Sequence, residues 1–397
     1  MDHRSLPILI STVMVGLIGA TASFAAGQPR WQPMLEAVPG VPQQQAAAKG
    51  TQRVLGVKWF RGDLEASIAS AKQANQPIAV HFLPEWSEWS KHMVAKSIAD
   101  EGVRMEMKHF VALNIDPQIE SGAALVKRFG VRTFPSIVFL NADGQIEDLL
   151  AGYIPPRAYQ RELNRIRNDK GTVSDLRRRS VVDPMDLQVR HELAQKLWDL
   201  GDDAGFRENM EFIKANDPAG ISLPMRRITL WNHQEDIFGC RSNGGKVDLE
   251  PLVIFLASEK HDAVRYEGFT YLAGVYQQLG QPKESRDAYR EAAKFVSDID
   301  LPTWGSAVAG VFENQKEQLS KAEKSFALKF ARKAASAAKR LDEDLIVRAE
   351  CQVILAKCYA MMGKKELALK ALQIAADLQP EEVELAKELE ALRIQIS

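Results

Sequence analysis

Cysteine is scarce in this chain of 397 residues, and none occurs before Cys240. Three cysteines are too few, and odd in number, for a disulfide framework. Cys351 and Cys358 lie seven residues apart in a helical pattern, so their α-carbons are about 10 Å apart and cannot be bridged. We expect both to be small buried apolar residues. Cys240 lies in the predicted loop FGCRSNGG, which contains nothing that would activate a thiol.

The patterns of several other kinds of site are also missing. The seven histidines form no His-x3-His pair and no cluster with cysteine, which argues against a metal site. No glycine-rich phosphate loop and no Gly-x-Ser-x-Gly elbow occurs. The formal net charge of -1 gives no indication of nucleic-acid binding. We therefore predict a protein without metal, cofactor or nucleic-acid partner.

Long apolar runs are confined to the N-terminus. Residues 1–25 combine a short basic start, an apolar stretch and small residues before a cleavage point, which is the pattern of a signal peptide. The rival interpretation is an uncleaved membrane anchor over residues 6–26, which would keep the protein near a membrane. We expect an exported protein, periplasmic or otherwise extracytoplasmic.

Three further segments follow this N-terminal stretch. Residues 26–52 are rich in Pro, Gln, Ala and Gly without periodicity, and they are predicted to form a flexible linker. Residues 53–168 alternate between strand and helix patterns, which indicates an α/β domain. From residue 183 to residue 397 the strand pattern is absent, and helical segments broken by Gly, Pro and Asp follow one another.

Two stretches of the helical region, 266–299 and 349–382, align with each other without gaps. Small residues and a turn glycine recur in both, for example Ala273 with Ala356. The spacing resembles the tetratricopeptide repeat (TPR), a helical hairpin of about 34 residues. The resemblance implies an all-α TPR-like solenoid over residues 183–397.

The stretch WSEWS, residues 86–90, directly follows a predicted strand and precedes a helical pattern. The box of the same letters in cytokine receptors belongs to a β-sandwich, and no sandwich can be assembled here. With Trp86, Pro135 in the context TFP, and Gly152, the segment instead resembles the thioredoxin active site and its cis-proline loop. The resemblance implies a thioredoxin-like fold over 53–168, most similar to exported disulfide reductases.

The departures from the thioredoxin pattern concern the chemistry. Ser87 and Ser90 stand where the family has its two cysteines, and His81 stands where it has a buried acid. A serine hydroxyl supplies neither a thiolate nor a resolving thiol, so we predict a degenerate redox motif and no catalytic residues. Serine is a good helix cap. The alternative is a serine-dependent hydrolase with His81 or His92 as base, which would also need an oxyanion hole and an orienting acid.

The resemblances together favour an exported, redox-inactive protein that binds other proteins or unfolded polypeptide, similar to the chaperedoxin-type fusions of thioredoxin and TPR. Such a protein would act as chaperone, scaffold or assembly factor. The candidate partner-binding residues are Trp86, Trp89, Phe134 and Pro135. A rival interpretation is that Trp89 folds back, for instance onto Phe134, and fills the vacant site.

Two further alternatives stay open. The protein is either such a binding protein or an enzyme, the latter a hydrolase or an atypical thiol-disulfide oxidoreductase that uses a cysteine from elsewhere. The basic stretch 320–340 is expected to be a solvated outer face of a repeat, with membrane lipid or an acidic partner as the alternative.

Overall fold

The structure, a computed structural model, describes residues 57–397 except 243–244, 342, 381–385, 388, 392–393 and 395–397. The predicted signal peptide, 1–25, and the predicted linker, 26–52, therefore lie outside the described residues. Within the described part of the chain, no helix is both long enough and apolar enough to cross a membrane.

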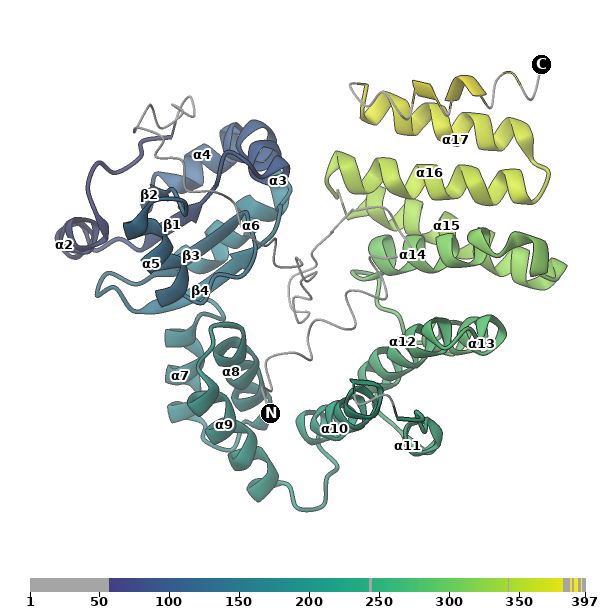
Figure 1. The fold of residues 1–397 in the computed structure, drawn as a ribbon, viewed down its shortest axis with the longest axis horizontal. Helices are drawn as coiled ribbons and strands as arrows, with labels where there is room; N and C mark the ends of the chain where they lie inside the picture. Colours follow the sequence, from purple (N-terminus) through teal and green to yellow (C-terminus); the bar gives the residue numbers. More distant parts are fainter. Residues whose placement is uncertain are drawn as a thin grey trace. The chain divides into compact units, whose positions relative to one another are not determined.

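A four-stranded sheet forms the centre of the first part of the chain (Figure 1). Its order is β2-β1-β3-β4, with β1 parallel to β2 and β3 antiparallel to both β1 and β4. The strands are β1 (Ile78–Phe82), β2 (Val111–Ile115), β3 (Ser136–Leu140) and β4 (Ile146–Ala151). β1 and β3 are central and buried along their whole length, which explains their nearly continuous apolar sequences.

Helices cover both faces of the sheet, so the expected α/β fold is confirmed. One face of the sheet is covered by α2 (Leu64–Ala74) and α5 (Glu120–Arg128). Apolar side chains of α2, and Leu125 and Val126 of α5, form a core there with alternate residues of β1. On the other face Tyr159 of α6 (Pro156–Arg167) reaches His81 of β1. The remaining elements are α3 (Glu88–His92), the π-helix η2 (Met93–Ile98) and α4 (Glu101–Met107).

Three helices continue from the α/β layer in the same compact unit, whose described part is 57–228. They are α7 (Val173–Val182), α8 (Leu187–Asp199) and α9 (Asp203–Asn216). α7 and α8 share a small apolar core of their own, including Leu176 and Leu193, and α7 also contacts β4. Contacts therefore join these helices to the sheet, and an independent domain 53–168 stays a prediction.

In the second compact unit, 229–397, every described element of secondary structure is a helix. It begins within α10 and continues as helices that pair with their neighbours along the chain, α12 with α13, α14 with α15, and α16 with α17 (Figure 1). The helices are α10 (Leu223–Ser242), α11 (Glu250–Ser258), α12 (Asp262–Gln278), α13 (Pro282–Ala292), α14 (Leu301–Asn314), the 3-10 turn η3 (Lys316–Gln318), α15 (Lys321–Arg340), α16 (Leu345–Met361) and α17 (Lys365–Leu378).

Turn glycines close three of the helix pairs at equivalent places. Gly201, Gly280 and Gly363 have φ values of 78°, 69° and 70°, a conformation that other residues adopt at a cost. Gly280 and Gly363 are a pair that the sequence alignment predicts, and the Gly201 turn follows the same scheme. A solenoid-like helical region is thus confirmed, while its assignment to the TPR stays a prediction.

The cysteines fall as expected with one correction. Cys351 and Cys358 are buried and unbridged on α16, and the thiol of Cys351 lies 3.3 Å from the carbonyl oxygen of Pro302 on α14. Burial raises the pKa of both thiols to about 12, so they are packing residues. Cys240 is exposed, but it lies in the last turn of α10 rather than in a loop, because the helix continues to Ser242.

Candidate functional site

The two serines lie at the start of α3, immediately after the loop that leaves β1. Ser87 is the N-cap of the helix: its backbone is extended, and its hydroxyl accepts a hydrogen bond of 3.2 Å from the N–H of Ser90. Ser90 itself is only 1% exposed, and its hydroxyl oxygen has no hydrogen-bond partner among the described residues. Ser87 therefore caps the helix, and Ser90 is buried away from solvent.

The two tryptophans beside the serines are partly exposed and partly packed. Trp86 is 53% exposed and contacts the ring of Phe134 edge-on, at 5.7 Å between centroids. Trp89 is 42% exposed and contacts Tyr153 at 5.9 Å and His92 at 6.1 Å. These five residues are called the aromatic surface below.

The ring contacts show which tryptophan lies beside Phe134. The ring of Trp86 lies there, and among the described residues the ring contacts of Trp89 are with Tyr153 and His92 instead. Trp89 thus packs against Tyr153, a residue that the sequence does not single out, and against His92. Half of each indole is still open to solvent, which leaves both available to a partner.

Backbone interactions hold the segments that carry the aromatic surface. The peptide bond between Phe134 and Pro135 is cis, as the resemblance to the cis-proline loop implies. The carbonyl oxygen of Pro135 accepts a hydrogen bond of 2.8 Å from the N–H of Gly152, which has a φ of 83°. Only a residue such as glycine adopts this conformation without strain, and the turn carries Tyr153 into the aromatic surface.

A π-helix follows α3 without a break. Segments of this kind are rare and occur mostly near functional sites. Ser97 of η2 donates a hydrogen bond of 2.5 Å to the carbonyl oxygen of Ile154. This bond ties the helix that carries Trp89 to the loop that carries Tyr153, so the contact between the two rings is fixed from both sides.

His81 is not available as a base for either serine. Its Nε2 lies 2.6 Å from the hydroxyl of Tyr159, and its Nδ1 lies 3.2 Å from the carbonyl oxygen of Ala79. Trp59 packs on the ring edge-on. Burial lowers the pKa of His81 to about 4, despite the opposing effect of its backbone hydrogen bonds. The side chain is therefore neutral at pH 7 and engaged by these partners, so the geometry does not support His81 as the base of a hydrolase.

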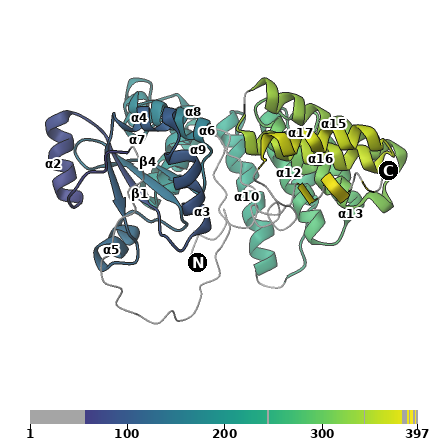
Figure 2. The same cartoon turned by 90° about the horizontal axis from the view of Figure 1, so that it is seen from above.

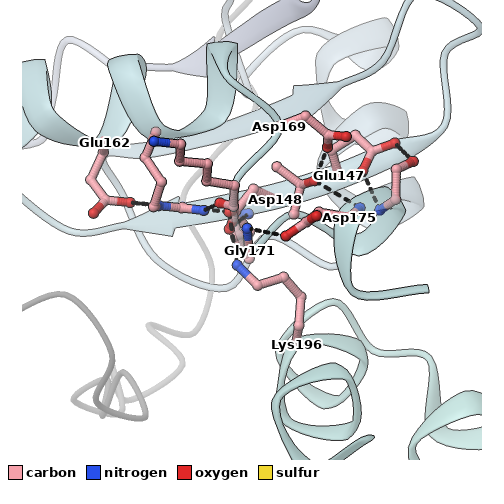
Figure 3. Close-up of polar contacts among 12 residues, drawn as sticks. Glu147, Asp148, Glu162, Asp169, Gly171, Asp175 and Lys196 are labelled. Atoms are coloured by element: carbon pink, nitrogen blue, oxygen red, sulfur yellow. Dashed lines mark hydrogen bonds and ion pairs between the residues drawn. The ribbon is translucent and has the colours of Figure 1, made fainter. Parts of the chain in front are cut away.

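A second buried polar group lies at the outer strand of the sheet, where β4 meets α6 and α8 (Figure 3). The carboxylate of Asp148 accepts from Arg165 at 2.5 Å and from Lys196 at 2.8 Å. Arg165 also donates to Glu162 at 2.8 Å. Burial acts to raise the pKa of Asp148, but the attraction of Lys196 and Arg165 outweighs it and holds the pKa below its usual value.

The carboxylate of Glu147, next to Asp148 on β4, connects the same strand to α7. Glu147 accepts a hydrogen bond of 2.8 Å from the backbone N–H of Ser174, at the start of α7, and a short one from its hydroxyl. Sequence patterns do not reveal either group, since no local signal connects Asp148 of strand β4 with a lysine in the distant helix α8. The same applies to Tyr159, the partner of His81.

The comparisons with known proteins begin with a family model, which agrees with the fold of this part of the chain. The family model described as "Thioredoxin-like domain" matches residues 64–167. A thioredoxin from Thermus thermophilus is similar at 22% identity, covering 28% of this chain and 88% of that one, with a TM-score of 0.26. The C-terminal domain of DsbD from Neisseria meningitidis is similar at 20% identity, covering 26% and 92%, with a TM-score of 0.23.

A third similar structure is the N-terminal domain of stress-induced protein-1 from C. elegans, at 14% identity, covering 34% of this chain and 99% of that one, with a TM-score of 0.27. No curated protein matches the chain. Residues 64–167 thus form a thioredoxin-like domain, and a helical region follows it.

Proposed function

We propose that this chain is an exported protein that binds other proteins or unfolded polypeptide through the aromatic surface, and that it catalyses no thiol-disulfide exchange. The half-exposed pair Trp86 and Trp89 carries the proposal. Tryptophan is enriched among the residues that dominate binding energies, and exposed indoles are unusual unless they are used.

The chemistry of the same site supports the absence of redox activity. Disulfide exchange needs a thiolate and a second thiol to release the mixed disulfide. Ser87 is engaged in capping and Ser90 is buried. The buried cysteines lie in the other compact unit, with raised thiol pKa values, and Cys240 alone is exposed. A domain with this site is suited to bind a polypeptide rather than to catalyse disulfide exchange in it.

The helical region fits a chaperone, scaffold or assembly role. Solenoids of helical hairpins present extended surfaces on which peptides and proteins bind. We propose that the helical hairpins from 183 to 397 are TPR-like and that they act together with the aromatic surface on the same partners. Export through the predicted signal peptide would place these partners in the periplasm or an equivalent space.

The test uses the double change Trp86→Ala with Trp89→Ala in the full chain. The probe is carboxymethylated α-lactalbumin, which stays unfolded and has no free thiol, and binding is followed by fluorescence anisotropy of the labelled probe. We expect affinity to fall at least tenfold, about 1.4 kcal/mol. The melting temperature should change little, because half of each indole already contacts water.

The matched control is Met105→Ala with Ile119→Ala, which removes two side chains of similar exposure, 53% and 55%, elsewhere in the same domain. It should bind the probe as the unchanged protein does. Equal loss in both double variants would show nonspecific apolar adhesion. Undiminished binding by the tryptophan variant would move the binding site to the helical region.

A further inference from the structure

The exposed charged residues of α15 are all cations, and they lie on one side of the helix. The exposed residues of this helix fall on one third of its circumference at 100° per residue, and they extend for about 28 Å at 1.5 Å per residue. None of them is acidic. The cations of this side, called the cationic face below, are Lys321, Lys329, Arg332, Lys333, Lys339 and Arg340.

Most of these cations form no ion pair with the residues that the structure describes. Arg340 lies 2.9 Å from Asp298, an ion pair that is itself exposed, and Lys333 lies over the ring of Phe330. Among the described residues, the other four cations have no acidic partner: Lys321, Lys329, Arg332 and Lys339.

The one acid of the helix faces away from this side. Glu323 receives hydrogen bonds from Ser320 in a capping box and from Arg286 of α13 at 2.8 Å. Its carboxylate is therefore committed to the helix start and to the neighbouring helix. The opposite side of α15 packs on α14 and α16, and Figure 2 shows α15 beside α16. The apolar core of the unit therefore fixes the orientation of the cationic face.

The composition of the cationic face indicates what kind of partner it fits. Protein interfaces have an apolar centre depleted in charge, with aromatic anchors. The positions between the cations here are Ala322, Ser325 and Ser336, and none of the exposed large apolar side chains lies on α15. A straight row of long cations separated by small residues matches a flat anionic surface rather than a shaped protein surface.

We propose that the cationic face binds the surface of an anionic phospholipid bilayer. Each lysine or arginine near such a surface strengthens the attraction, and the effect falls off within a Debye length. Without apolar side chains on this face, the helix lies at the headgroups and does not insert, unlike an amphipathic anchor. The predicted export of the chain would bring it next to such a bilayer.

The experiment is co-sedimentation of the chain beginning at Gly27, which retains every described residue and lacks the apolar stretch. The vesicles are phosphatidylcholine alone, or phosphatidylcholine with 30% phosphatidylglycerol. We expect binding to the anionic vesicles only, weakened at least tenfold between 50 and 300 mM NaCl. The triple variant Lys329→Gln, Arg332→Gln, Lys339→Gln should weaken it at least tenfold, with an unchanged circular dichroism spectrum.

The matched control neutralises three exposed cations of the first compact unit, in the variant Arg61→Gln, Lys108→Gln, Lys127→Gln. It should bind anionic vesicles as the unchanged chain does. The proposal is overturned if anionic vesicles are not bound, or if both triple variants bind equally. Tighter binding to a 20-base-pair DNA duplex than to the anionic vesicles would also overturn it, because the face would then recognise polyanions of another class.

Discussion

Replacing Asp148 by asparagine should destabilise the first compact unit severely, because this buried carboxylate is the shared partner of two partly buried cations. Arg165 lies 2.5 Å and Lys196 2.8 Å from the same oxygen, and the side chain of Asp148 is 5% exposed. Breaking a buried ion pair by removal of one partner costs about 3–5 kcal/mol. We expect a loss of that size in the free energy of unfolding for Asp148→Asn.

The geometry also predicts an order among the variants. Lys196→Met should cost less, about 1.5–3 kcal/mol, since Asp148 keeps its hydrogen bond with Arg165. The double variant Asp148→Asn with Lys196→Met should lose less free energy of unfolding than the sum of the two single losses, because the two residues interact directly. Asp143→Asn is the control: it breaks the exposed pair of Lys72 and Asp143, whose side chains are 55% and 73% exposed, and should cost at most about 1 kcal/mol.

The measurement is urea unfolding of the full chain, followed by hydrogen exchange of peptides from β4 and α8. These two elements carry Asp148 and Lys196, so their exchange reports on the unit that the ion pairs connect. Equal stability of Asp148→Asn and Asp143→Asn would refute the reasoning. So would a cost for Lys196→Met as large as that for Asp148→Asn, since the charge of Arg165 would then contribute nothing.

The remaining predictions concern pH, packing and redox chemistry. Burial lowers the folded-state pKa of His81 to about 4. Burial, together with the charge of Arg227, lowers that of His191 to about 4 as well. The stability that each neutral histidine contributes is therefore fully present above pH 6.5 and is lost as the pH falls toward 4. Urea titrations should show a loss approaching about 3 kcal/mol for each histidine, and a flat profile would contradict this. Ala356→Leu should overpack the buried side of α16 and cost about 1–3 kcal/mol, whereas the exposed Ala360→Leu should leave the melting temperature unchanged. The full chain should reduce insulin no faster than the blank, and Ser87→Cys with Ser90→Cys should restore weak activity only, because the neutral His81 replaces an acid.

The fold was predictable where the sequence pattern is local. The buried strands β1 and β3 have continuous apolar sequences, and the turn glycines at 280 and 363 follow from an internal alignment. The family resemblance located Pro135 in its cis loop. These features depend on a few neighbouring residues, which is why one sequence is sufficient to predict them.

The contacts within the site were less predictable. Tyr153 reaches Trp89 only because Gly152 turns the chain back beside Pro135, and a pairing across 64 residues has no periodic signature. Similarly, Lys196 looks like an ordinary polar helix residue until the fold brings it to β4. The glycine and serine around Cys240 predict a loop, yet α10 includes Cys240 and ends only at Ser242.

The central claim, that the aromatic surface holds other proteins, is tested most directly by photocrosslinking in cells that export the chain. Trp89 is replaced by p-benzoylphenylalanine, an aromatic crosslinker of similar size, and Ile119 is replaced in the same way as the reference position. The account predicts adducts with other proteins from position 89 and far fewer from position 119, although both are exposed. Equal adducts from both positions, or none from position 89, would contradict it.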